Sequence, residues 1–171
     1  KSMGKWVDIK GPVVADTVYS DNVLVAKDTS FTLPGIEFLT ADVQAMGTMT
    51  VPLIGLLENM ELSVTKIGVD NGLSRLNRLE KQNLEFRWVQ SVISSDGSQS
   101  TEGCKAFVRT LPSNIPEIGV EVGNATEVEA TYNVTRLQIY ANGVEVLCVD
   151  RLNQILRVNG KDYYQSIDNL L

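Results

Sequence analysis

The sequence predicts a mainly β, antiparallel fold with a single helix docked on the sheet. Three observations predict it: alternating apolar residues, glycine-containing turns and one stripe of leucines. The alternation is clearest where Met60, Leu62 and Val64 stand between polar neighbours. The same period recurs in two further sets, Leu84, Phe86 and Trp88, and Val128, Ala130, Tyr132 and Val134. Each set indicates a half-buried strand.

Two glycine turns support this pattern. Asp96-Gly97 follows one strand, and Asn142-Gly143 separates Leu137–Tyr140 from Val144–Val149, both rich in β-forming residues. Asn-Gly readily supplies the positive φ angles of a tight hairpin turn. We therefore expect antiparallel strands joined by short connections.

One segment has helical spacing. Asp70 or Asn71 is a suitable N-cap, and Leu73, Leu76 and Leu79 follow at intervals of three. This spacing places the leucines on one stripe, which predicts a helix packed against the sheet.

Between Glu37 and Val64 the pattern predicts two long strands joined by a connection over residues 47–55. This region is unusually apolar for a surface segment, and exposed apolar patches often mark contacts with another chain. The alternative is that the segment folds back to complete its own core. The candidate contact residues are Met46, Met49, Val51, Leu53, Ile54, Leu56 and Leu57.

Composition narrows the class of protein. The 171 residues fit one domain over 1–171, and a net charge of -6 disfavours a dedicated nucleic-acid reader, which needs Lys and Arg. The chain has no apolar run of about 18 residues, and Lys1–Lys10 lacks the apolar segment of a signal peptide. We expect no membrane anchoring and synthesis inside the cell.

Catalytic and metal-binding patterns are weak. The chain contains no histidine, and Cys104 and Cys148 are too far apart in sequence for a C-x-x-C pair. An enzyme would therefore need carboxylates alone, such as Glu58 with Glu61 or Glu127 with Glu129. Solvated charges on strand faces explain these pairs more simply. We expect no catalytic site, no metal and no cofactor, and keep a small carboxylate-based hydrolase as the remote alternative.

The C-terminal third carries a motif of fixed spacing, D-x-x-N-x-I-x-x-V-N-G-x-D. It is met at Asp150, Asn153, Ile155, Val158, Asn159, Gly160 and Asp162. This string resembles the end of the major tail tube protein of contractile-tailed phages. A weaker similarity to the same family lies in Ser30-Phe31-Thr32-Leu33-Pro34, which precedes the long hairpin there.

The resemblance implies a β-barrel or two-sheet sandwich with a flanking helix and a long β-hairpin. It further implies hexameric rings that stack into the inner tube of a contractile phage tail or tail-like bacteriocin, assembled in the bacterial host cytoplasm. The implied partners are copies of the chain itself, the sheath, baseplate and tape-measure proteins, and double-stranded DNA passing through the lumen. The alternative within this class is a ring-forming protein of a type VI secretion system.

Within such a tube, we expect two polar strand faces to line the lumen and make it acidic, so that DNA does not adhere. The expected lumen residues are Thr40, Asp42, Gln44, Asn59, Glu61, Ser63 and Thr65. For the C-terminal motif we favour a structural role, with a turn at Asn159-Gly160 and with Asp150 and Asn153 satisfying backbone groups near it. Residues 161–171 should form a short helix or arm.

Overall fold

The computed structural model describes residues 8–171 and confirms the predicted mainly β, antiparallel fold with few helices. Its two helices are α1 (Asn71–Leu76) and α2 (Gln165–Asp168). The strands are β1 (Ile9–Ser20), β2 (Val23–Lys27), β3 (Ser30–Thr32), β4 (Phe38–Gln44), β5 (Thr48–Leu57), β6 (Glu61–Ile67), β7 (Gln82–Ile93), β8 (Gln99–Pro112), β9 (Glu127–Ala141), β10 (Val144–Asp150), β11 (Ile155–Val158) and β12 (Lys161–Asp162).

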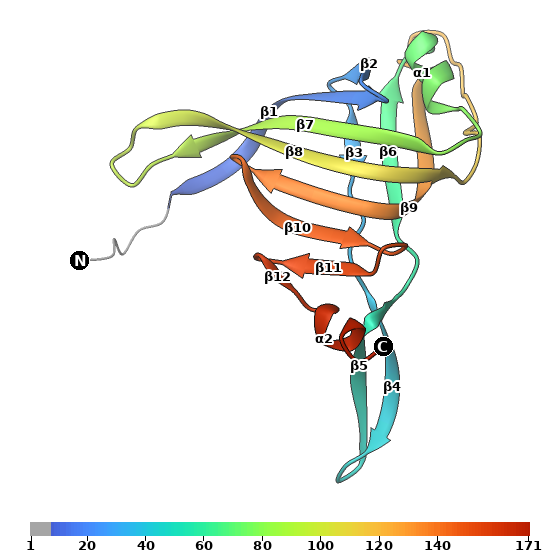
Figure 1. Cartoon of the computed structure of the whole chain (residues 1–171). Helices are drawn as coiled ribbons and strands as arrows, with labels where there is room; N and C mark the ends of the chain where they lie inside the picture. The colour runs from blue at the N-terminus through green and yellow to red at the C-terminus, as the bar shows by residue number, and fades with distance from the viewer. Residues whose placement is uncertain (1–7) are drawn as a thin grey trace.

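Ten of these strands form one branched antiparallel sheet, which we call the main sheet. Its path runs β12-β11-β10-β9-β8-β7-β1-β2. The branch lies at β9, which pairs with β8 along one edge; its other edge pairs with β6 over residues 127–133 and with β10 over residues 136–141. Strand β3 continues the branch by pairing with β6. Together β3 and β6 form an arm, the β3–β6 arm, that crosses β7 and β8 (Figure 1).

The core lies between this arm and the strands that it crosses. Phe86 on β7 has no exposed surface, and its ring centroid is 4.6 Å from that of Phe31 on β3. The apolar residues of the three predicted strands are buried, except that Trp88 is only partly so. The alternation therefore identified the core-facing side of β6, β7 and β9 correctly.

Helix α1 is shorter than predicted. Asp70 is its N-cap, accepting a hydrogen bond from the Leu73 backbone N–H at 3.1 Å, and Leu73 and Leu76 are buried as expected. The helix ends at Leu76, whose carbonyl accepts hydrogen bonds from the Tyr132 hydroxyl at 2.7 Å and from Gln82 Nε2 at 3.1 Å. The Tyr132 and Gln82 side chains therefore satisfy the carbonyl at the end of the helix. Leu79 lies outside the helix and is exposed, so the prediction that it belongs to the buried leucine stripe is wrong.

The predicted turns are present. Asn142 and Gly143 both have positive φ, 49° and 80°, between β9 and β10, and Gly97 has a φ of 87° between β7 and β8. Asn159 and Gly160, with φ of 52° and 78°, join β11 to β12. The predicted C-terminal helix or arm is present as α2.

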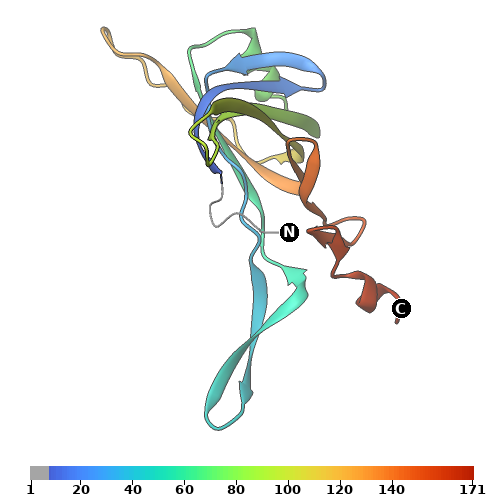
Figure 2. The same cartoon turned by 90° about the vertical axis from the view of Figure 1, so that its left-hand side faces the viewer.

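The long hairpin differs from the prediction. Residues 47–55 are not a connection: the turn lies at Ala45–Gly47, where Met46 and Gly47 have positive φ, and β5 runs on to Leu57. Strands β4 and β5 form a separate two-stranded sheet that projects away from the main sheet (Figures 1 and 2). Met49 and Val51 alternate with Thr48 and Thr50 in β5, and Leu53, Ile54, Leu56 and Leu57 belong to the same strand, whereas Met46 lies in the turn.

Candidate assembly surface

The β4–β5 hairpin has one polar face. Cross-strand pairing sets Asp42 opposite Thr50 and Gln44 opposite Thr48. The Thr50 hydroxyl donates to Asp42 Oδ1 at 3.1 Å, and Gln44 Nε2 donates to Thr48 Oγ1 at 3.2 Å. Thr40, Asp42 and Gln44 are therefore brought together as the alternation predicted. Thr48 and Thr50 complete this face and were missed, although their alternation with apolar neighbours was readable in the sequence.

The opposite face of the hairpin is apolar. Val43 lies opposite Met49, and Ala41 lies opposite Val51. Val43 and Met49 are exposed, and within residues 8–171 neither β4 nor β5 pairs with a third strand. The hairpin thus presents an apolar face and two open strand edges, which are features that pair readily with another chain.

The predicted contact residues are distributed along this hairpin. Met46 is fully exposed at the tip, and Met49 and Val51 lie on the apolar face, where alternation also places Leu53. Ile54 and Leu56 are exposed beyond it, beside Gly55. Leu57 is different, because it packs against the main core at the root of the hairpin. The role of these residues in contacts between copies stays a prediction.

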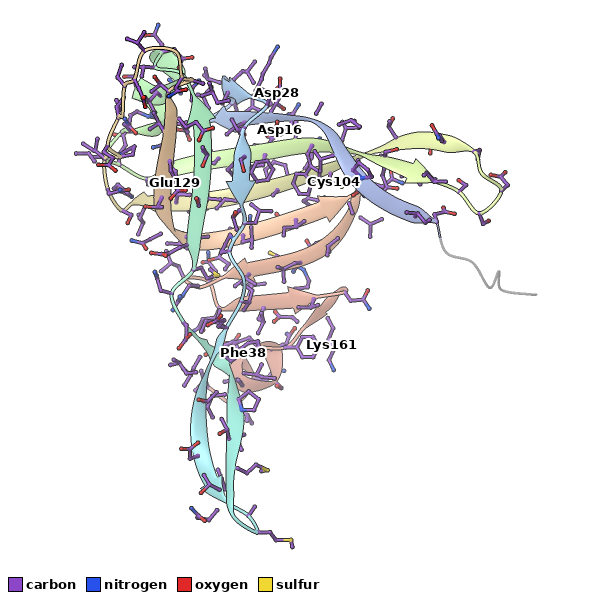
Figure 3. The ribbon with its side chains drawn as sticks, turned by 180° about the vertical axis from the view of Figure 1, so that it is seen from behind. Asp16, Asp28, Phe38, Cys104, Glu129 and Lys161 are labelled. Atoms are coloured by element: carbon purple, nitrogen blue, oxygen red, sulfur yellow. The ribbon has the colours of Figure 1, made fainter. Side chains whose placement is uncertain are left out.

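The root of the hairpin is held from the C-terminal part of the chain. The Arg151 guanidinium donates to the carbonyls of Glu58 at 2.7 Å and of Leu57 at 3.0 Å. Gly55, with a φ of 110°, lies so close to α2 that an added Cβ would stand 3.0 Å from Ile167 Cδ1. Phe38, labelled in Figure 3, marks the same root on β4. These contacts fix where the hairpin leaves the main sheet.

The C-terminal motif forms the turn that carries Arg151. The Asp150 carboxylate accepts hydrogen bonds from the Leu152 N–H at 3.2 Å, from the Asn153 N–H at 3.1 Å and from Asn153 Nδ2 at 2.8 Å. Asp150 therefore satisfies backbone groups as predicted, and Asn153 supports its carboxylate. They order the turn between β10 and β11, so their predicted place near Asn159-Gly160 is wrong. Asp162 accepts instead from the Leu156 and Tyr164 N–H groups, at 3.3 and 3.0 Å.

The second set of predicted lumen residues lies on the main sheet. Glu61, Ser63 and Thr65 belong to β6, whose neighbours are β3 and β9, so the two predicted polar faces are not on adjacent strands. Asn59 lies two residues before the start of β6, and its Nδ2 donates to Asn133 Oδ1 at 3.1 Å. The residues paired with this set on β9 are Glu129, Thr131 and Asn133 (Glu129 is labelled in Figure 3). These three residues were not assigned to the lumen from the sequence. Their signal was the polar side of the β9 alternation.

One carboxylate near the hairpin root is perturbed. A side-chain hydrogen bond with Glu37, together with the charge of Glu37, raises the pKa of Glu58 above its ordinary value. The carboxyl that raises the pKa of Glu58 is that of Glu37, which was not singled out from the sequence. It is not that of Glu61, the residue paired with Glu58 in the sequence analysis. Both carboxyls lie where β4 and β5 join the main sheet, since the Glu58 N–H donates to the Glu37 carbonyl at 2.9 Å.

Other sites were considered in the described part of the chain. Residues 8–171 contain no cluster of three or more Cys, Asp or Glu side chains placed to hold a metal ion. Cys104 and Cys148 are buried free thiols. No helix between residues 8 and 171 has the length and apolar character to cross a membrane.

Comparison with solved structures shows a fold shared with contractile systems. The chain superimposes with a TM-score of 0.52 and 16% identity on a chain of an extracellular contractile injection system, in a structure described as the PVC sheath-tube complex in its extended state. The match covers 76% of this chain and 90% of the other.

The family follows from the sequence. A model of the phage tail tube protein FII family matches residues 14–171, and the chain belongs to that family. It is therefore a structural protein rather than an enzyme, as predicted. No curated protein matches the sequence significantly.

Proposed function

We propose that the chain forms hexameric rings that stack into the inner tube of a contractile phage tail or tail-like bacteriocin. The observation that carries this proposal is the β4–β5 hairpin, with its apolar face and two unpaired edges. An isolated two-stranded hairpin is at best marginally stable in water, and open edges accept further strands. Copies of the same chain would supply both the missing strands and the cover for the apolar face.

In this tube the polar faces line a lumen that conducts DNA or ions. Thr40, Asp42 and Gln44 on the hairpin and Asn59, Glu61, Ser63 and Thr65 at β6 are polar and at least partly exposed. Repetition of Asp42 and Glu61 around a ring gives an acidic lining. Such a lining repels phosphates, whereas a basic one would hold DNA by releasing counterions.

The tube works inside a larger particle. Its partners are a sheath around the tube, a baseplate at its end and a tape-measure protein in its interior. Assembly takes place in the host cytoplasm. The sheath is supported by the similar chain, which comes from a sheath-tube complex.

Electron microscopy of the purified protein in negative stain tests this function. The wild-type chain is expected to form hexameric rings and tubes. Leu53→Asp places a charge on the apolar face of the hairpin and should leave a folded chain that does not polymerise. Thr48→Asp is the matched control, because it places the same charge on the polar face and should still form tubes.

Three results would contradict or redirect the proposal. A wild-type chain that stays monomeric when concentrated would refute self-assembly. Full-length tubes from Leu53→Asp would refute the role of the apolar face. Rings that never stack would favour the ring of a type VI secretion system over a tail tube.

A further inference from the structure

A cleft of about 500 Å³ lies on the main sheet and is lined by side chains of β7, β8 and β9. Phe107, Arg109, Arg136 and Tyr140 are among its lining residues. Arg109 on β8 and Arg136 on β9 are direct cross-strand partners. Like charges directly opposite each other destabilise a sheet, so a pair of facing arginines calls for anions nearby.

The acidic side chains of the same chain neutralise the two arginines of the cleft only in part. Asp150 lies 3.4 Å from Arg136 Nε, while Asp21 at the rim is paired with Arg78 at 2.6 Å and Glu85 is paired with Arg87. Among the described residues, Arg109 forms no salt bridge, and its Nε is buried without a hydrogen-bond partner. The cleft therefore contains a cation that lacks a counter-charge.

The loop between β8 and β9, residues 113–126, has the complementary character. The sequence between Arg109 and Arg136 contains no Lys or Arg, and the loop carries exposed Glu117 and Glu121. Glu121 stands between Val120 and Val122, whose exposed fractions are 81% and 101%.

This loop is ordered at its ends and at its tip. The Thr131 hydroxyl donates to Asn114 Oδ1 at 2.9 Å, and the Gly68 N–H donates to the Thr126 carbonyl at 2.8 Å. A turn from Glu121 to Asn124, with a 3.2 Å backbone hydrogen bond, shapes the tip. Because the tip is held outward, its acidic and apolar side chains are preorganised for contact with another molecule.

We propose that residues 120–122 of one copy insert into the Arg109–Arg136 cleft of a neighbouring copy. The Glu121 carboxylate pairs with the Arg109 guanidinium, and the two valines pack against Phe107 and Tyr140. The loop and the cleft are different surfaces, so the contact is heterologous and builds rings or filaments. This inference rests on the proposed self-assembly and specifies one of its contacts.

Charge reversal tests the contact by sedimentation velocity, which reports the concentration at which copies associate. Glu121→Arg should raise that concentration by about tenfold or more, because it sets a cation against Arg109. Arg109→Glu should do the same, and the double variant should recover association. Glu117→Arg is the matched control, with the same change of charge in the same loop, and should associate as the wild type does.

A second measurement keeps the test independent of the folding of the Arg109 variants. A variant carrying both Val122→Cys and Tyr140→Cys keeps Arg109 and Glu121, and it should form an intermolecular disulfide on oxidation only when both substitutions are present. Glu121→Arg lies at an exposed tip and should retain the circular dichroism spectrum of the wild type.

The outcomes separate this contact from the tube itself. Normal tubes from Glu121→Arg, or no cross-link, would overturn the contact and leave the proposed function standing. A wild-type chain that never associates would overturn both. If Arg109→Glu abolished binding of a labelled DNA duplex while tubes formed normally and Glu121→Arg had no effect, the cleft would be a phosphate site and the proposal wrong.

Discussion

Replacing Asp150 with alanine removes a buried carboxylate on which several interactions converge. Its side chain is 4% exposed, accepts three hydrogen bonds from Leu152 and Asn153, and lies 3.4 Å from Arg136 Nε. Alanine leaves two backbone N–H groups without this acceptor and leaves Arg136 without its counter-charge. The turn that carries Arg151 loses its internal support.

The structure sets the size of the effect. Breaking a fully buried ion pair costs about 3–5 kcal/mol, but the Arg136 side chain keeps 26% of its surface exposed and its charge is partly screened. Hydrogen bonds to a charged acceptor contribute about 1.5–3 kcal/mol each and do not add fully. We expect a loss of about 3 kcal/mol in the free energy of unfolding, which lowers Tm by about 6–12 °C for a chain of this size.

Urea denaturation followed by circular dichroism measures this loss. Asp150→Asn is the conservative variant, because it retains one acceptor oxygen and should lose about half as much stability. Asp42→Ala is the control for loss of an exposed carboxylate and should change the free energy of unfolding by at most about 0.5 kcal/mol. An Asp150→Ala variant that unfolds at the wild-type urea concentration would refute the reasoning.

The Asp150 carboxylate also makes the free energy of unfolding depend on pH, in a direction that follows from its lowered pKa. Burial alone would raise the pKa of Asp150, but hydrogen bonds from Asn153 and Leu152 and the charge of Arg136 lower it below its ordinary value of 3.8. A lowered folded pKa stabilises the protein above the unfolded value, and this contribution is lost as the pH falls through the folded value. The stability difference between wild type and Asp150→Asn should therefore be constant near neutrality and shrink below about pH 3.8.

Three further predictions follow from individual contacts. Arg151→Ala should speed amide hydrogen exchange in the β4–β5 hairpin several-fold with little change in Tm, because it frees only the carbonyls of Leu57 and Glu58; uniform exchange across the chain would contradict a local role. Phe86→Ala should lower the free energy of unfolding by about 3–5 kcal/mol in urea denaturation, and a loss below about 1 kcal/mol would contradict its place in the core. Burial raises the pKa of the Cys148 thiol, so iodoacetamide should label it slowly in the folded protein and rapidly in urea; equal rates would contradict its burial.

Local patterns were sufficient to predict β6, β7, β9 and β10 of the main sheet, whereas β1, β2 and β8 were not predicted. Met60, Leu62 and Val64 alternate with polar residues because one side of β6 faces the core, and this relation can be read directly from sequence. The end of α1 could not be read in this way. It depends on Tyr132, which reaches the helix terminus from a distant part of the chain, and on Gln82 at the start of β7.

The candidate assembly surface was only partly predictable for the same reason. The polar alternation of Thr40, Asp42 and Gln44 was evident, but its partner strand was misplaced because Met46-Gly47 was not recognised as a tight turn. Met46 tolerates a positive φ only at some cost, and such a turn has no strong sequence signal. The pairing of Glu58 with Glu37 depended on that register and was lost with it.

The hairpin root explains how a motif on one part of the sheet bears on a surface elsewhere. Strand β5 ends at Leu57 and β6 begins at Glu61, so the carbonyls of Leu57 and Glu58 lie where the chain passes from one sheet to the other. Arg151 satisfies both carbonyls, and Asp150 orders the turn from which Arg151 extends. In a ring of identical copies, every hairpin must leave its subunit in the same direction for the edges to meet. Because β4 and β5 pair only with each other in the described chain, their direction depends on these root contacts rather than on a shared sheet, and loss of Asp150 should impair assembly more than the loss of stability alone explains.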